Sequence, residues 1–583
     1  MTNTLRVFAY SLAVGIVLSV ASKASAQTVP TDAQLTCTVT APVFASWFQS
    51  GMVAPNGVVN PANSVTFPNV PNCSFYQWSK QMFLWLTSPA PVTYGGGGGR
   101  IFDSPTFFDV SPPDASGQRT FIPHTPGLIR NFGVRAAQVG PHGLPVAVTR
   151  AGTLVEVESV PIAPSGNQLI RNRAGSLVEV ARATVANGKI SFLDTAGKAI
   201  QPLVAPAVKA LSVTAAKNQL STLPTLQRLL IRGKTIFVDP SGNVVEVDEG
   251  QAGGGDVLQA QVSANGSLVY FVTIVNDVYT YFLTGAKDGG ITPAPTQFPT
   301  TAADLAKVVT FAAAHGKTFP DPNALAIEVK SSWVEAAGLP NASTYITMTA
   351  NIPTFDKTNP ALWVPNGQKS AMLGLVGVHV VGSTAGHPEM IWATFEHFNN
   401  TPNGAYQYNA TSGTNPKTVP QSTAGTWLFS ANGATAPFNT SHMRMSAANL
   451  QAISPNNVTP SNTIRWKAWG AAFNLAPNPL DPTPAASNTE IISIHNSISS
   501  MMPAGDLRNN YVMSGATWTI GGAAPTNSNQ VGTSMLTNTT METYQQGTSN
   551  QTPGTNCFSC HTSNTTGVSH IFGGPSTGLK PLF

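Results

Sequence analysis

The sequence predicts a mixed, β-rich α+β scaffold with a β-hairpin-rich insertion. Short alternating runs with glycine-containing turns between them recur from about residue 140 to 275, for example LVEVESV and IFVDPSGNVVEV. Apolar residues at helical spacing are confined to a few segments, such as FYQWSKQMFLWL at 75–86, which is soon followed by a proline. Hydrophobic residues make up 42% of the chain and charged residues only 10%, so a large core is expected.

The first element, residues 1–26, is predicted to be a signal peptide. Arg6 precedes the apolar run VFAYSLAVGIVLSVA, and the small residues ASA precede Gln27. An uncleaved membrane anchor is the alternative. No later apolar run approaches the roughly 18 residues of a membrane helix, so no membrane span is expected after cleavage. The chain should therefore be periplasmic or secreted, and its net charge of +4 is too weak to predict a nucleic-acid partner.

Four further segments follow the signal peptide. Residues 27–97 form an N-terminal segment that holds Cys37 and Cys73. An oxidising compartment predicts one disulfide between these cysteines, with two separate buried thiols as the alternative. The others are an inserted module at 140–275, a main scaffold domain at 276–534 and a C-terminal segment at 535–583. Within the module, LSTLPTLQRLLIRG (220–233) is expected to be helical.

The main scaffold contains a predicted helix at 301–316, capped by Thr301, and a strand that opens in NALAIEVKSSWVEA. Next comes a predicted hairpin, with runs at 373–381 and 389–398. On its second run His387, Glu389 and His397 share one face, and Met390 and Trp392 share the other. The two histidines are ten residues apart, roughly 33 Å along a strand, which is too far for them to bind one metal. TSMLTNTTMETYQQ (533–546) is predicted to be a short helix.

The C-terminal segment contains the most distinctive motif, CFSCH, which consists of Cys557, Cys560 and His561. C-x-x-C-H is the attachment signature of c-type haem. Two thiols on one helical turn reach the two porphyrin vinyl groups, and the next histidine falls under the iron. A thioredoxin-like site would follow a strand, whereas this motif follows YQQGTSNQTPGTN, and structural zinc would need a second ligand pair. We therefore expect one covalent haem c on a short C-terminal helical haem-attachment segment.

The sixth iron position is open to several ligands. The tail after the motif contains no methionine, and its one strong donor is His570, which would complete a bis-histidine iron. Alternatives are an upstream histidine, an open site, or an upstream methionine, such as Met443, Met445, Met501, Met502 or Met513. Arg465 and Lys467 are candidates to meet the haem propionates.

The segments FLWLTSPAP, HPEMIWATFEH, NTTMETYQQ and CFSCH…SHIF together resemble large bacterial periplasmic cytochrome c family proteins with one haem. The resemblance covers the N-terminal segment and about 320–572. It implies thioether bonds at Cys557 and Cys560 and axial ligation by His561. The expected function is electron transfer with an unknown redox partner protein. A haem-dependent redox enzyme of peroxidase or oxygenase type, and a binding module with a docked redox or sensor haem, are the alternatives. No catalytic residue stands out.

Overall fold

The structure is a computed structural model, in which residues 1–26, the predicted signal peptide, lie outside the described residues. The described residues are 29–68, 72–96, 99–111, 118–125, 130–134, 138–139, 145–149, 154–159, 163, 167–172, 174, 176–186, 189–201, 225–231, 234–241, 243–245, 247–248, 257–431, 433–446, 449–452, 457–471, 483–526, 529–533, 535–546, 549–550, 557–561, 565–569, 571–572 and 578–583. Within them the chain is a β-rich α+β protein, as predicted.

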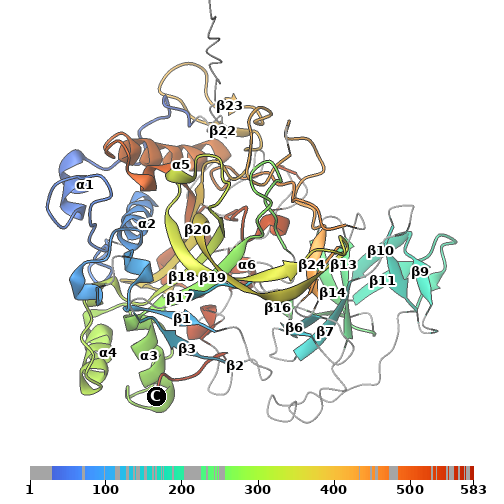
Figure 1. Cartoon of the computed structure of the whole chain (residues 1–583), viewed down its shortest axis with the longest axis horizontal. Helices are drawn as coiled ribbons and strands as arrows, with labels where there is room; N and C mark the ends of the chain where they lie inside the picture. The colour runs from blue at the N-terminus through green and yellow to red at the C-terminus, as the bar shows by residue number, and fades with distance from the viewer. Residues whose placement is uncertain are drawn as a thin grey trace, which may run out of the picture.

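A twisted central sheet organises the scaffold (Figure 1). Its main path runs through β27 (Gln530–Gly532), β26 (Tyr511–Thr519), β21 (His387–His397), β20 (Leu362–Thr384), β18 (Ile327–Glu335), β17 (Tyr270–Asn276), β1 (Phe107–Val110) and β3 (Phe121–Pro123). Four more strands join it off this path, namely β19 (Thr347–Asp356), β25 (Asn449–Ala452), β24 (Met443–Ser446) and β4 (Arg130–Asn131).

The predicted hairpin is β20–β21, and its alternation determines what each face of the sheet contacts. The strands pair antiparallel, with Val381 opposite Trp392 and His379 opposite Thr394. Val378 and Val380 belong to one hydrophobic core, whereas Val381 and Trp392 belong to another. Since successive side chains of a strand point to opposite faces, the sheet separates these two cores.

Helices α1 (Ala41–Trp47), α2 (Asn72–Leu86) and α5 (Pro484–Ser499) contribute to the first core. The helix predicted at 75–86 is confirmed as α2, and its bulky residues are buried against the sheet, where Phe83 stacks on Phe395 at 4.3 Å. The disulfide predicted between Cys37 and Cys73 is also confirmed, with the two Cα atoms 5.2 Å apart. It ties the chain before α1 to the start of α2.

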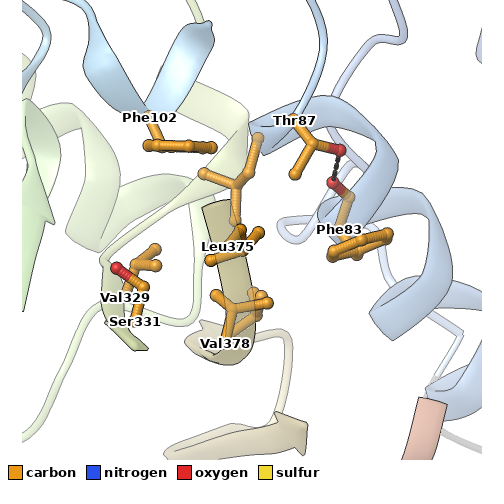
Figure 2. Close-up of a pocket in the computed structure, with 9 residues that line it drawn as sticks. Phe83, Thr87, Phe102, Val329, Ser331, Leu375 and Val378 are labelled. Carbon is orange, nitrogen blue, oxygen red and sulfur yellow. Dashed lines mark hydrogen bonds between the residues drawn. The ribbon is translucent and has the colours of Figure 1, made fainter. Parts of the chain in front are cut away.

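A small apolar cavity remains between α2 and the sheet (Figure 2). Figure 2 shows Phe83 of α2 and Thr87, the residue after α2, on one side and Leu375 and Val378 of β20 on the other, with Thr87 Oγ1 donating to the Phe83 carbonyl at 2.6 Å. The volume open to the centre of a water-sized sphere is about 10 Å³. That is space for about one water molecule, so the cavity does not accommodate an organic ligand.

The second core lies under α3 (Asp277–Asp288) and α4 (Ala302–Ala314). Asn276 caps α3 by accepting from the Tyr279 amide at 3.0 Å. The predicted Thr301 cap of α4 is confirmed as a full capping box with Asp304. Both helices therefore begin at positions that their local sequence specifies.

The insertion forms separate small sheets on the side of the molecule away from α1–α4 (Figure 1). One sheet has seven strands, namely β15 (Val244–Val245), β14 (Lys234–Val238), β13 (Thr225–Ile231), β7 (Leu154–Ser159), β6 (Pro145–Thr149), β16 (Val247–Asp248) and β5 (Gln138–Val139). The others are β10 (Arg182–Ala186) with β11 (Lys189–Leu193) and β12 (Ala199–Ile200), and β8 (Leu169–Arg171) with β9 (Leu177–Glu179).

The helix predicted at 220–233 is wrong where the structure describes it. Residues 225–231 are strand β13, which pairs with β14 on one side and β7 on the other. Leu226 and Leu229 are buried there. Pairing on both sides satisfies the backbone groups of this segment and overrides its weak preference for a helix. At the end of the module, β17 pairs with β1 and β18 in the central sheet.

Two short sheets complete the fold: β2 (Gln118–Arg119) with β28 (Gly578–Leu579), and β22 (Tyr406–Tyr408) with β23 (Lys417–Val419). In the part of the chain that the structure describes, no helix combines the length and the hydropathy that a membrane crossing requires.

Candidate cofactor-attachment site

The CFSCH motif forms a single helical turn in the second core. Helix α6 spans Cys557–Cys560, and the His561 amide donates to the Cys557 carbonyl at 2.9 Å, which extends the turn by one residue. Residues three apart on a helix lie on the same side. The backbone positions of the two cysteines therefore share one side of the turn, with His561 immediately after them. The Cys560 side chain lies outside the described part.

The imidazole of His561 has a defined orientation. Its Nδ1 lies 2.6 Å from the Val568 carbonyl oxygen, and the residue is 5% exposed. A carbonyl oxygen can only accept, so Nδ1 carries the proton and the lone pair of the neutral ring is on Nε2. The Trp392 ring packs against the imidazole with centroids 4.1 Å apart. A backbone carbonyl on the second nitrogen is the usual support of a metal-ligating histidine.

The walls around this turn are apolar. The core that contains Cys557 is completed by residues from β20, β21 and the chain on both sides of the motif, namely Val381, Met390, Trp392, Leu536, Phe558, Val568, Ile571 and Phe572. Cys557 is 9% exposed and Phe558 is fully buried. Such a site excludes water from whatever the cysteines and His561 hold.

The chain after the motif is tied to α3 and to the sheet. Ser569 Oγ donates to Glu328 at 2.6 Å and lies 2.8 Å from the Tyr279 hydroxyl. Lys287 Nζ donates to the carbonyls of Phe572 and Leu579, both at 2.6 Å, although burial lowers the pKa of Lys287 to about 8. The long scaffold therefore supplies the walls and the anchors that a segment this short cannot make by itself.

The chain before the motif does not form the predicted helix. Residues 535–546 run as turns, with a short 3₁₀ turn at Thr543–Gln545. Asn538 donates through Nδ2 to Thr394 Oγ1 at 2.8 Å, and the Thr539 amide donates to Glu396 at 2.9 Å. Threonine and asparagine side chains compete with the backbone for hydrogen bonds, which is why they disfavour helix interiors. Here these bonds fasten the segment to the sheet face that carries Trp392.

The predicted second-ligand candidates fall in different places. His570 lies outside the described residues, although Ser569 and Ile571 on either side of it are buried. The upstream methionines, Met443, Met445, Met501, Met502 and Met513, all belong to or pack against the first core, whereas Cys557 belongs to the second. A methionine that the sequence did not single out, Met390, is fully buried in the core of Cys557.

Met390 adopts a φ of +68°, rare for a residue other than glycine, within the irregular pairing at the start of β21. No sequence pattern predicts this conformation. The sequence did predict that Met390 and Trp392 share one face of the strand. That face packs against His561, so this pattern could have indicated that Met390 lies near the motif.

Arg465 and Lys467 have partners in the protein interior, and their contact with haem propionates stays a prediction. Arg465 is 1% exposed and donates to Glu396 at 2.8 Å and to Asn403 at 2.9 Å. Lys467 is 2% exposed and donates to the Gln546 carbonyl. Lys467 therefore contacts the chain before the motif directly, and Arg465 supports it through Glu396, which also accepts from the Thr539 amide.

The histidines of β21 have separate structural partners. His387 Nδ1 lies 2.8 Å from Glu389 Oε1, and His397 stacks on Tyr345 at 3.8 Å. Burial lowers the pKa of His397 to about 3, so this ring is neutral. Among the described residues, no group of three or more histidine, cysteine or acidic side chains is arranged to hold a metal ion.

The chain matches no protein-family model, and neither curated proteins nor solved structures give a significant match.

Proposed function

We propose that this protein is an exported c-type cytochrome that carries one covalent haem and transfers electrons to a partner protein. The observation that supports it most is the single turn Cys557–Cys560 followed by a buried His561 whose Nδ1 is held by Val568. The confirmed disulfide supports export, because disulfides persist in oxidising compartments. We also propose, from the resemblance of its segments, that the chain is related to large bacterial periplasmic cytochrome c family proteins with one haem.

The residues present fit such a haem. Cys557 and Cys560 would form the thioethers, and the lone pair of His561 Nε2 would face the iron. The haem supplies a one-electron redox centre. Trp392 and the Val568 carbonyl hold the imidazole in one orientation, and Phe558 keeps water from it. A rigid, dry site suits electron transfer, because little has to reorganise when the charge changes.

The attachment is tested by replacing both motif cysteines. We expect the purified wild-type protein to give a c-type pyridine haemochrome, with one haem that stays on the chain after denaturation. The Cys557→Ser, Cys560→Ser variant is expected to lose all covalent haem, measured by mass spectrometry and by haem staining of denaturing gels. The matched control is Cys37→Ser, Cys73→Ser, which removes the disulfide and leaves the motif. Haem that remained covalently bound to the motif variant would refute the proposal.

We further propose His570 as the sixth ligand. Its neighbour Ile571 is buried in the core of Cys557, so the tail is anchored at this point. A His570→Ala variant is expected to turn partly high-spin and to bind carbon monoxide faster, measured by absorption spectra and flow kinetics. Met390→Leu is the matched comparison, because Met390 is the methionine in the same core. A low-spin spectrum that is unchanged in His570→Ala and lost in Met390→Leu would assign the ligand to Met390 and exclude His570.

A further inference from the structure

A buried imidazole–carboxylate pair lies on the sheet face that carries the attachment segment. His379 Nε2 of β20 is 2.9 and 3.1 Å from the two carboxylate oxygens of Glu542, which belongs to the chain just before the motif. The Asn538 amide donates to the same carboxylate at 2.9 Å. Each of the paired side chains is 11% exposed. The pair is thus shielded from bulk solvent, yet protons can still reach it.

This pair is close to the attachment site. His379 is two residues from Val381, on the same face of β20, which is a distance of roughly 7 Å. Val381 belongs to the core of Cys557 and Phe558, and its partner across the hairpin is Trp392, which packs on His561. Among the described residues, the pair is therefore connected through two side chains, Val381 and Trp392, to the imidazole that would ligate the iron.

The other charged and titratable groups on this face have defined surroundings. On β18, Lys330 is opposite His379 and Glu328 is opposite Val381. Glu328 accepts from Ser569, and on β21 Glu396 is paired with Arg465. On α3, burial raises the pKa of Tyr279 well above its usual range, so this phenol stays neutral. Two further groups of α3 titrate in or next to this range. Burial raises the pKa of Asp277, which is paired with Lys317, to about 6. Burial lowers the pKa of Lys287, which donates to the carbonyls of Phe572 and Leu579, to about 8, so a variant at His379 is needed to separate the pair from these groups.

We propose that the His379–Glu542 pair takes up one proton from solvent when the haem takes up one electron, which couples electron transfer to proton transfer. This inference rests on the proposed haem. The partner protein supplies the electron and solvent supplies the proton that the imidazole of His379 accepts, so that the local net charge is the same before and after. Because the medium is poorly polarisable, an added electron is otherwise uncompensated and favours protonation of a basic group close by.

The environment of Glu542 determines which member of the pair changes its protonation state. Burial alone would raise the pKa of Glu542, but the contact with the His379 ring, the Asn538 amide and Lys330 together hold it below the usual value. The carboxylate therefore stays ionised, so the imidazole is the member of the pair that can accept a proton. Histidine is the side chain that ordinarily titrates between about pH 5 and 8, so the coupling should appear in that range.

The test is the midpoint potential of the holoprotein measured by spectroelectrochemistry from pH 5 to 8. We expect the wild-type potential to fall as pH rises, by up to about 59 mV for each tenfold fall in proton concentration. Reduction in weakly buffered solution with an indicator dye should take up a corresponding fraction of one proton per electron. His379→Gln should flatten the pH dependence and abolish most of the uptake.

His315→Gln is the matched control, because His315 is an exposed histidine after α4. It should leave both the slope and the uptake unchanged. Glu542→Gln provides a second variant if His379→Gln does not accumulate, and it should shift the pH range of the slope downward. A wild-type potential that does not depend on pH, a slope that persists in His379→Gln, or a slope whose pH range is unchanged in Glu542→Gln overturns the inference. Failure of the haem proposal can be distinguished from failure of this inference, because the wild-type protein would then give no c-type haemochrome.

Discussion

Replacing Lys80 with methionine is expected to stabilise the fold by on the order of 4 kcal/mol at pH 6. Lys80 lies in α2 and is 5% exposed. Burial lowers the pKa of its ammonium to about 7, from a usual 10.5. Among the described residues, the contact found for the ammonium is the Phe395 ring at 5.6 Å, with no carboxylate partner. A buried charge without a counter-ion costs stability, and methionine fills a similar volume without the charge.

The pH dependence follows from the direction of this shift. Below about pH 7 the amine is protonated in both the folded and the unfolded chain, so the folded state carries the full cost. Between pH 7 and 10.5 the folded chain has released the proton and the unfolded chain still holds it. The contribution of Lys80 to wild-type stability should therefore rise across that window, and Lys80→Met should lack this rise.

Urea denaturation at pH 6, 8 and 10 measures both expectations. Lys307→Met is the matched control, because Lys307 is an exposed lysine of α4. It should change the free energy of unfolding by less than about 0.5 kcal/mol at each pH. A Lys80→Met variant with the stability and the pH profile of the wild type would contradict the prediction.

Replacing Glu396 with alanine is expected to destabilise the fold by about 3–5 kcal/mol. The Glu396 side chain is fully buried, and its partner Arg465 is 1% exposed. Removal of the carboxylate leaves the guanidinium charge buried without its counter-ion, which is far costlier than the loss of a surface ion pair. It also removes the acceptor of the Thr539 amide, so the segment before the motif should loosen.

Thermal denaturation and hydrogen exchange at Thr539 measure these two effects. Glu335→Ala is the matched control, because Glu335 pairs with Lys369 at the surface and should cost no more than about 1 kcal/mol. A Glu396→Ala variant as stable as Glu335→Ala would show that the buried pair does not hold the segment. Adding Arg465→Met to Glu396→Ala should recover part of the lost stability, because it removes the unpaired charge.

Local patterns in the sequence determined several features of this protein. Thr301 and Asp304 suffice for a capping box because a helix start is a contact between residues three apart. The alternation of residues in β20 and β21 predicted that Trp392 and His387 lie on opposite faces of the sheet. His561 packs on the face that carries Trp392. The disulfide followed from the number of cysteines outside the motif. The motif itself predicts its cofactor because the spacing of the two thiols and the histidine is a property of one helical turn.

Long-range packing decided the rest. Residues 225–231 became a strand because β7 and β14 were available to pair with it, although the segment by itself predicts a helix. The pKa of Lys80 is lowered because α2 packs against the sheet and buries the ammonium. Nothing in the helix sequence distinguishes Lys80 from a surface lysine. His379 and Glu542 are 163 residues apart, and Glu396 and Arg465 are 69 apart. Such pairs form only when distant parts of the chain meet on the sheet, since each polar group is buried by residues distant in the sequence.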